Sequence, residues 1–212
     1  ACNYWQQGVD GLYIAHWFDH WPYAADFYEK LREVAYPEVM AAKDKIYRVP
    51  TEGSAPAKAV VAPNAANPLP LALAKGRAVQ VGFTVSDDLR KWGKVKRVHE
   101  VILRVRLQET TERDRWRFVF NGRELPEESL RSINQMYVMD APRYRVFGYW
   151  FVFRLDEKMW PIQGRNVLEV ELVKRDVQAL PLVRLRDVEL EIRYLLGKNF
   201  HRALIDADLA PG

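Results

Sequence analysis

The stretch "VILRVRLQETTERDRWRFVFNGRELP", residues 101–126, carries the strongest fold signal in the chain. Apolar residues occupy every second position from Val101 to Leu107, and arginines separate the later ones. A second alternating run, 116–120, ends at Asn121-Gly122, a dipeptide that favours a tight hairpin turn. Because successive side chains of a strand point to opposite faces, this pattern predicts antiparallel strands with one face buried and the other in water.

The same period of two recurs on both sides of this stretch. Further alternating runs lie at 79–85, 168–172 and 188–194. The run "YRVFGYWFVFRL" (144–155) is aromatic on both faces, which predicts a central strand. Half-buried strands separated by turn residues predict a mainly β fold over residues 71–212, an antiparallel β-sandwich or jelly roll.

A different kind of sequence precedes this domain. The opening "ACNYWQQG" predicts the last turn of a helix, which Gly8 ends in a left-handed conformation. The apolar run Leu12–Ala15 is typical of a strand covered on both faces, as in parallel sheets. Residues 1–49 are therefore predicted to form a short α/β segment. The buried stripe expected on the helix that follows the strand consists of Tyr23, Phe27, Leu31 and Val34.

Residues 50–70 differ in composition from both neighbours. Five prolines in this range disfavour a helix and a central strand. We therefore expect a linker between the α/β segment and the sandwich domain. Because a natural chain rarely begins at the end of a helix, we also expect the chain to be the C-terminal part of a longer gene product or the product of a truncated reading frame.

Composition excludes several classes of protein. No apolar run reaches the ~20 residues of a membrane span, so no membrane partner is expected. A single cysteine, Cys2, rules out an internal disulfide framework, and no pattern predicts a metal site or a cofactor. The net charge is +4, and in 101–118 the charges of both signs are interspersed. This favours a solvated sheet face over a nucleic-acid patch, so no nucleic acid is expected as a partner.

The segment "HWFDHW" (16–21) holds the densest group of polar and aromatic side chains. If Leu12–Ala15 is a barrel strand, this segment follows its carboxyl end, where α/β enzymes build their sites. The alternative is that the aromatics pack the end of the barrel and the histidines bond to the backbone. A metal is less favoured, since a loop with two histidines sets no geometry. The substrate-binding candidates are His16, Trp17, Asp19, His20 and Trp21.

Two tryptophans of the sandwich domain, Trp92 and Trp160, are candidates for stacking on a sugar ring. The alternative for both is packing in the core or against a neighbouring domain. The pair Asp87-Asp88 precedes "LRKWG" and predicts a turn or a helix start, and two adjacent acids are weak grounds for a calcium site.

Four segments together resemble one family: "YWQQGVDGLYIAHWF" (4–18), "KDKIYRVP" (43–50), "FNGRELP" (120–126) and "GRNVLEVELVKR" (164–175). They are similar to the C-terminal part of bacterial (β/α)8 glycoside hydrolase-like proteins. The resemblance implies the last strand-helix unit of a TIM barrel followed by a β-sandwich, in a parent that hydrolyses carbohydrate. The catalytic acids of such a family match no position in this sequence.

Three hypotheses follow for the function. The first is a non-catalytic C-terminal fragment of a carbohydrate-active protein. The second is a carbohydrate-binding or purely structural sandwich. The third is an independent enzyme that uses His16, Asp19 and His20. Carbohydrate is the expected partner, a homodimer through the N-terminal segment is left open, and the sequence does not indicate a compartment.

Overall fold

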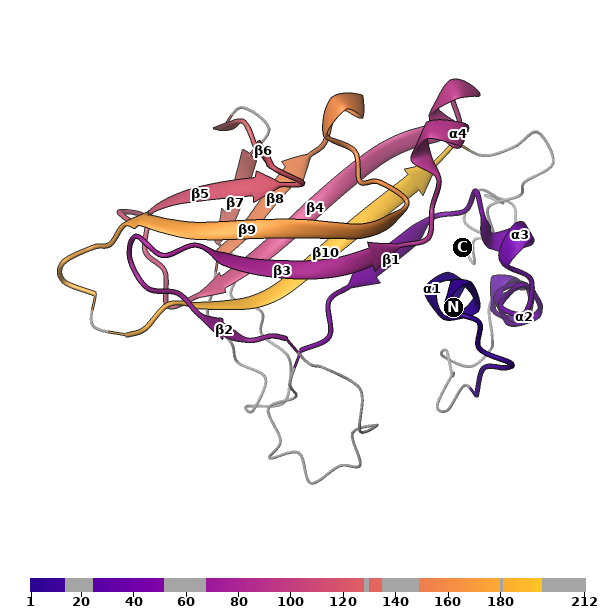
Figure 1. The fold of residues 1–212 in the computed structure, drawn as a ribbon, viewed down its shortest axis with the longest axis horizontal. Coiled ribbons are helices and arrows are strands. Elements are labelled where there is room, and N and C mark those ends of the chain that lie inside the picture. The colour runs from indigo at the N-terminus through magenta and orange to yellow at the C-terminus, as the bar shows by residue number, and fades with distance from the viewer. Residues whose placement is uncertain (14–24, 52–67, 128–129, 135–148, 180, 196–212) are drawn as a thin grey trace, which may run out of the picture.

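The structure is a computed structural model that describes residues 1–13, 25–51, 68–127, 130–134, 149–179 and 181–195. Within these residues the chain is mainly β, and its strands form two antiparallel sheets (Figure 1). Side chains from both sheets meet in one hydrophobic core, in a sandwich-like arrangement. We call the strands β1–β10 and helix α4 the two-sheet body.

The larger sheet has six strands and the smaller has four among the described residues. The larger sheet runs in the order β1 (Lys45–Arg48), β10 (Arg184–Tyr194), β4 (Val98–Gln108), β8 (Tyr149–Arg154) and β7 (Leu130–Asn134), and β2 (Leu71–Ala72) also pairs with β10. The smaller sheet runs in the order β3 (Val79–Val85), β9 (Gly164–Lys174), β5 (Arg115–Phe120) and β6 (Arg123–Glu124).

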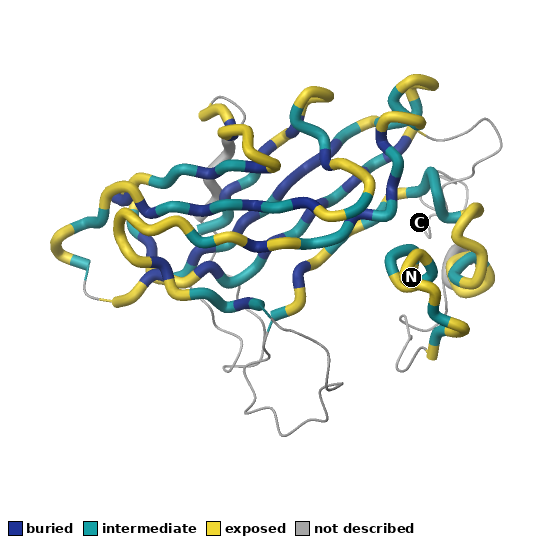
Figure 2. The backbone as a smooth tube through the Cα atoms, viewed as in Figure 1, coloured by how far each residue is buried: buried dark blue, intermediate teal, exposed yellow. Residues whose placement is uncertain are grey.

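The alternation in the sequence is confirmed as alternation in burial. Leu103, Val105 and Leu107 of β4 are fully buried, whereas the arginines between them face outward and are partly exposed. Figure 2 shows the same dark and light alternation along the long strands. The predicted turn at Asn121-Gly122 joins β5 to β6, and both residues have positive φ angles, 50° and 77°. That conformation is the one a two-residue hairpin of this twist requires.

Four short α-helices and one 3-10 helix complete the described residues. They are α1 (Cys2–Gln6), α2 (Ala25–Glu33), α3 (Pro37–Met40), α4 (Leu89–Lys94) and the 3-10 helix Glu157–Met159. The predicted helix start at Asp87-Asp88 is confirmed, because the Asp88 side chain caps α4 by accepting from the Lys91 N–H at 2.9 Å. None of the described helices is long and apolar enough to cross a bilayer.

The N-terminal helical segment, residues 1–13 and 25–44 with helices α1–α3, matches the sequence prediction in part. Helix α1 ends as expected, and Gly8 follows with φ at +80°. The predicted buried strand at Leu12–Ala15 is wrong at its first two residues. Leu12 and Tyr13 form no strand, and Tyr13 is 95% exposed. An apolar run becomes a buried strand only where another strand lies beside it, and none does here among the described residues.

The stripe predicted on the helix at 25–33 is also wrong at one position. Helix α2 forms, but Leu31 is 42% exposed, so this position is not buried. Val34 is half-buried just beyond the helix. Tyr23 lies outside the described residues, and the side chain of Phe27 is not described. Spacing alone sets which side chains share a face, and the neighbouring elements decide whether that face is covered.

The predicted boundaries at residues 49 and 70 also need correction. Strand β1 pairs with β10, and Val49 lies in the core, so residues 45–49 belong to the two-sheet body. Thr51 and Leu69 form a bridge to each other, and Leu69 lies in the same core as Val49. The segment between them therefore connects two points of one body and is no linker between domains. Prolines disfavour a helix and a central strand both in a linker between domains and in a connection within one domain. Composition therefore does not distinguish these two kinds of segment.

Candidate functional site

The first group of predicted site residues is not placed by the structure. His16, Trp17, Asp19, His20 and Trp21 all lie outside the described residues. Their proposed role in substrate binding therefore stays a prediction.

In the second group, Trp160 packs against Gly93, the residue that follows Trp92. Trp92 lies on α4 next to this glycine. A Cβ atom added at Gly93 would lie 2.8 Å from the Trp160 ring, so only glycine fits beneath the indole. Both indoles are half-buried and pack against the core. The Trp160 Nε1 donates to the Leu155 carbonyl at 3.2 Å, which fixes the ring. The contacts agree with the packing alternative, and sugar stacking stays a prediction.

A buried carboxylate, Asp87, is the centre of the polar cluster closest to the N-terminal helical segment. It lies in the loop between β3 and α4, and its side chain is 1% exposed. Its Oδ1 accepts from Lys45 Nζ at 2.9 Å and from the Tyr194 hydroxyl at 2.6 Å, and its Oδ2 accepts from the Tyr47 hydroxyl. Ser86 Oγ lies 2.7 Å from the Tyr47 hydroxyl. We call Asp87, Lys45, Tyr47, Tyr194 and Ser86 the Asp87 cluster.

Lys45 extends this cluster toward the helices. Besides Asp87, its ammonium group has two partners, since it donates to the carbonyls of Ala41 and Lys43 at 3.1 and 3.0 Å. The lysine therefore joins the turn after α3 to the loop before α4. An ammonium group carries three donors, and these three acceptors use all of them. The Asp44 carboxylate adds a contact by accepting from the Tyr194 backbone N–H at 2.7 Å.

Helix α1 reaches the same end of the two-sheet body. Asn3 Nδ2 donates to the Thr84 carbonyl of β3 at 2.7 Å, and Trp5 Nε1 donates to the Val34 carbonyl at 2.7 Å. These two bonds tie α1 to the body and to the turn between α2 and α3. Figure 1 shows the three helices gathered at this end of the sheets.

The protonation states of the Asp87 cluster follow from its burial. Burial raises the pKa of Tyr47 and Tyr194 far above the usual range, and the charge of Asp87 raises both further. The two phenols therefore remain neutral donors to the carboxylate. Burial also raises the pKa of the Cys2 thiol, against the opposing charge of Lys45. A protonated thiol is a poor nucleophile, so the chemistry available here is hydrogen bonding and ion pairing.

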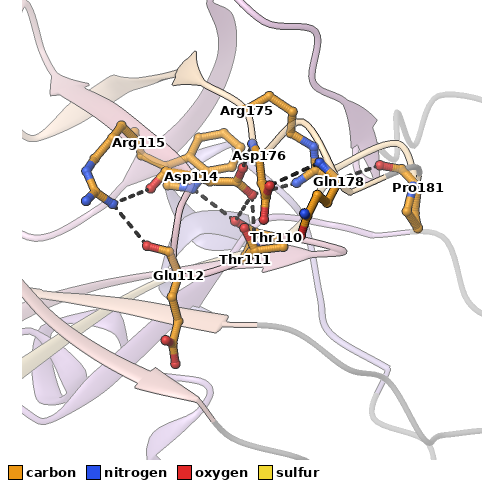
Figure 3. A network of polar contacts seen from close by, with 10 residues as sticks. Thr110, Thr111, Glu112, Asp114, Arg115, Arg175, Asp176, Gln178 and Pro181 are labelled. Atoms are coloured by element: carbon orange, nitrogen blue, oxygen red, sulfur yellow. Dashed lines mark hydrogen bonds and ion pairs between the residues drawn. The ribbon is translucent and has the colours of Figure 1, made fainter.

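A second buried carboxylate, Asp114, joins the loops at the opposite end of the body (Figure 3). Its Oδ2 accepts from Thr110 Oγ1 at 2.9 Å, from the Thr111 N–H at 2.8 Å and from Arg175 Nη1 at 2.5 Å. Its Oδ1 accepts from the Asp176 N–H at 2.8 Å. One carboxylate thus ties the β4–β5 loop to the β9–β10 loop.

The charge of Asp114 is stabilised by this arrangement. Burial pushes the pKa of the carboxyl up, but the hydrogen bonds from Thr111, Asp176 and Thr110 and the charge of Arg175 outweigh it. The net result is a pKa below the usual range. A carboxylate with this many protein donors is suited to holding loops in place.

Sequence reasoning missed both clusters. The sequence places Asp87 only in a turn or helix start, and it predicts no role for Asp114. Their partners are distant along the chain, with Tyr194 lying 107 positions from Asp87 and Arg175 lying 61 positions from Asp114. No local pattern signals such pairs, because the sheet register brings them together. The described residues contain no group of three or more His, Cys, Asp and Glu side chains suited to a metal ion.

We predict that Asp114→Asn destabilises the two-sheet body in a pH-dependent way. Near neutral pH the loss should be about 2 kcal/mol, because Asn cannot pair with Arg175 and accepts fewer hydrogen bonds. The folded pKa is depressed, so the charge contributes its full stability above the unfolded pKa of about 4. This contribution is lost as the pH falls through the folded pKa. The measurement is urea unfolding of both proteins across the acid range.

The exposed Asp10→Asn variant is the control and should unfold like the parent protein throughout. The stability gap for Asp114→Asn should close in acid. A gap of constant size down to low pH would contradict the assigned ion pair.

No family model matches the chain, and no curated protein matches it by sequence. The resemblance to glycoside hydrolase-like proteins therefore stays a prediction.

Proposed function

We propose that the chain is a non-catalytic accessory module of a carbohydrate-active protein, similar to the C-terminal part of bacterial glycoside hydrolase-like proteins. Its role is to hold the N-terminal helical segment against the end of the two-sheet body. The observation that carries the proposal is the Asp87 cluster, in which Lys45 joins the turn after α3 to the loop before α4. A buried charge that makes all its bonds within the protein serves to position elements.

Exposed aromatic side chains support the proposal that the helical segment, held in this position, contacts a further unit of the parent protein. Large apolar groups are exposed along its whole length, whereas those of β4 and β10 are in the core. A further unit of the parent protein would cover such a surface. The tyrosines that are more than half exposed in this segment are Tyr4, Tyr13, Tyr28 and Tyr36.

We further propose that the two-sheet body is a jelly roll. The strand pairs support this, since β2 pairs with β10, β3 with β9, β4 with β8 and β5 with β6. These pairs are nested like the rungs of one long hairpin. Rolling that hairpin up would add the pairs of β10 with β4 and of β9 with β5, and both are present. Jelly rolls include lectin domains, although a fold alone does not assign a function.

We expect Asp87→Asn to release the helical segment while the two-sheet body stays folded. Asn leaves Lys45 without its buried ion pair and places an amide against hydroxyl donors. Amide hydrogen exchange over residues 1–13 and 25–44 should then accelerate by an order of magnitude or more. The amides of β4 and β9 should keep their protection.

Asp114→Asn is the matched control, because it removes a buried carboxylate at the other end of the body. It should leave exchange in α1–α3 unchanged. Equal acceleration in the helices and in β4 would mean that the Asp87 cluster stabilises the whole fold. The proposed role of the cluster in holding the helical segment would then be wrong.

The non-catalytic assignment has a direct assay. The purified chain should release no more product from a panel of aryl glycosides and soluble polysaccharides than a heat-denatured sample does. Activity that disappears in a His16→Ala or Asp19→Ala variant would instead establish an independent enzyme built on residues 16–21.

A carbohydrate-binding module is the second candidate, favoured by two half-buried indoles, that of Trp92 and that of Trp160, which packs against the neighbouring Gly93. If this site binds sugar, Trp92→Ala should abolish retention on a neutral glycan panel. Trp116→Ala is the matched control, since it removes another half-buried indole at the opposite end of the body. Equal retention by all three proteins would leave only the structural role.

A further inference from the structure

One short segment of the chain holds an unbalanced group of positive charges. Residues 90–97, "RKWGKVKR", contain five Lys and Arg residues and no acid. These five charges exceed the net charge of the whole chain, +4. The interspersed charges at 101–118 are therefore not representative of this segment. We call Arg90, Lys91, Lys94, Lys96 and Arg97 the basic patch.

The structure presents this patch at one end of the two-sheet body. Helix α4 and the turn after it carry all five residues, and the side chains of Arg90, Lys91, Lys94 and Lys96 are exposed. In Figure 2 this end of the body, around α4, is largely exposed. Lys96 has a positive φ of 54°, so the chain turns sharply after α4. This turn keeps the cations at 96 and 97 close to those on the helix.

None of the five residues forms an ion pair with any described residue. Elsewhere on the body cations are paired, for example Arg106 with Asp187 at 3.2 Å and Arg117 with Glu171 at 2.8 Å. Within the patch, Lys91 Nζ lies 5.0 Å from the centroid of the Trp92 ring. The Nε of Arg97 is buried and has no hydrogen-bond partner among the described residues. Two carboxylates lie close to α4 without pairing with these cations, Asp88 at its N-cap and Glu157 beside Gly93. Cations that form no ion pair keep their charge available to an external anion.

We propose that the basic patch binds the carboxylate or sulfate groups of an acidic polysaccharide. The proposal rests on the carbohydrate-related function proposed above and names the chemical class of the sugar. Carboxylate and sulfate share the chemistry that the patch recognises, a fixed negative charge with several acceptor oxygens. Trp92 and Trp160 border the patch at Gly93 and give a sugar ring an apolar edge beside the cations.

The size of the patch favours a saccharide over a nucleic acid. Helix α4 has six residues, which corresponds to about 9 Å of helix. Proteins that bind duplex nucleic acid through its backbone commonly make about 6–10 phosphate contacts along a longer track. Three of the cations lie on this helix, and Lys96 and Arg97 follow in the turn after it. Five cations in so short a segment match a few charged sugar units.

The experiment measures binding by calorimetry to polygalacturonate, dextran sulfate, neutral dextran and single-stranded DNA, at about 50 and about 200 mM salt. The test variant replaces Lys91, Lys94 and Lys96 with Gln. The control variant replaces Lys75, Arg77 and Lys174 with Gln, which removes the same charge from exposed positions at the opposite end of the body. All of these side chains are exposed, so the three proteins should unfold at the same temperature.

The expected result is that the parent protein binds polygalacturonate or dextran sulfate, that salt weakens this binding, and that the test variant binds about tenfold more weakly. The control variant should bind like the parent. Comparing the two acidic polymers shows whether carboxylate or sulfate is preferred.

Three results would overturn the proposal. They are no binding to either acidic polymer, an equal loss in both variants, and tighter binding to single-stranded DNA than to the acidic polymers. Binding to neutral dextran that persists in the test variant, without binding to acidic polymers, would overturn the basic patch and leave the carbohydrate-related function standing.

Discussion

The burial of the Asp87 carboxylate constrains the arrangement of this end of the molecule. A buried charge is costly unless donors surround it, and here the donors come from β1 and β10. In the register of these strands Lys45 lies opposite Ile192 and Tyr47 lies opposite Leu190. A slip of β1 by one residue would turn both donors to the outer face and leave the carboxylate without its cation and with Tyr194 alone of the three donors. The charge therefore fixes the register of a strand only four residues long.

Asp114 plays the corresponding part at the other end, with a different set of donors. Two backbone N–H groups, a threonine hydroxyl and the Arg175 guanidinium hold it, whereas Asp87 is held by a lysine and two tyrosines. The donors of Asp114 belong to the two loops that it joins. Those of Asp87 belong to strands and reach helices through Lys45. The need of a buried carboxylate for donors thus ties two loops together at one end of the body and attaches the helical segment at the other.

The sequence predicted those parts of the fold that depend on local patterns. Alternation located β3, β4, β5, β9 and β10, the Asn-Gly pair located a hairpin, and the adjacent acids located the start of α4. It did not predict β1, because "KIYR" is short and two of its residues are charged. Only pairing with a strand some 145 positions later gives that segment its structure. The bridge between Thr51 and Leu69 is not predicted for the same reason, because proline content does not show which residues of the segment pair with each other.

Whether a surface cation has an acid partner also depends on residues that are distant along the chain. On the outer sheet faces, cations pair with acids of a neighbouring strand, as Arg104 does with Glu191 and Arg193 with Glu100. Neighbouring strands supply these partners at fixed spacing. Helix α4 lies in the connection between β3 in one sheet and β4 in the other, and none of its cations forms an ion pair with a described acid. Its cations therefore keep an unbalanced positive charge, even though the composition of the chain as a whole is close to neutral.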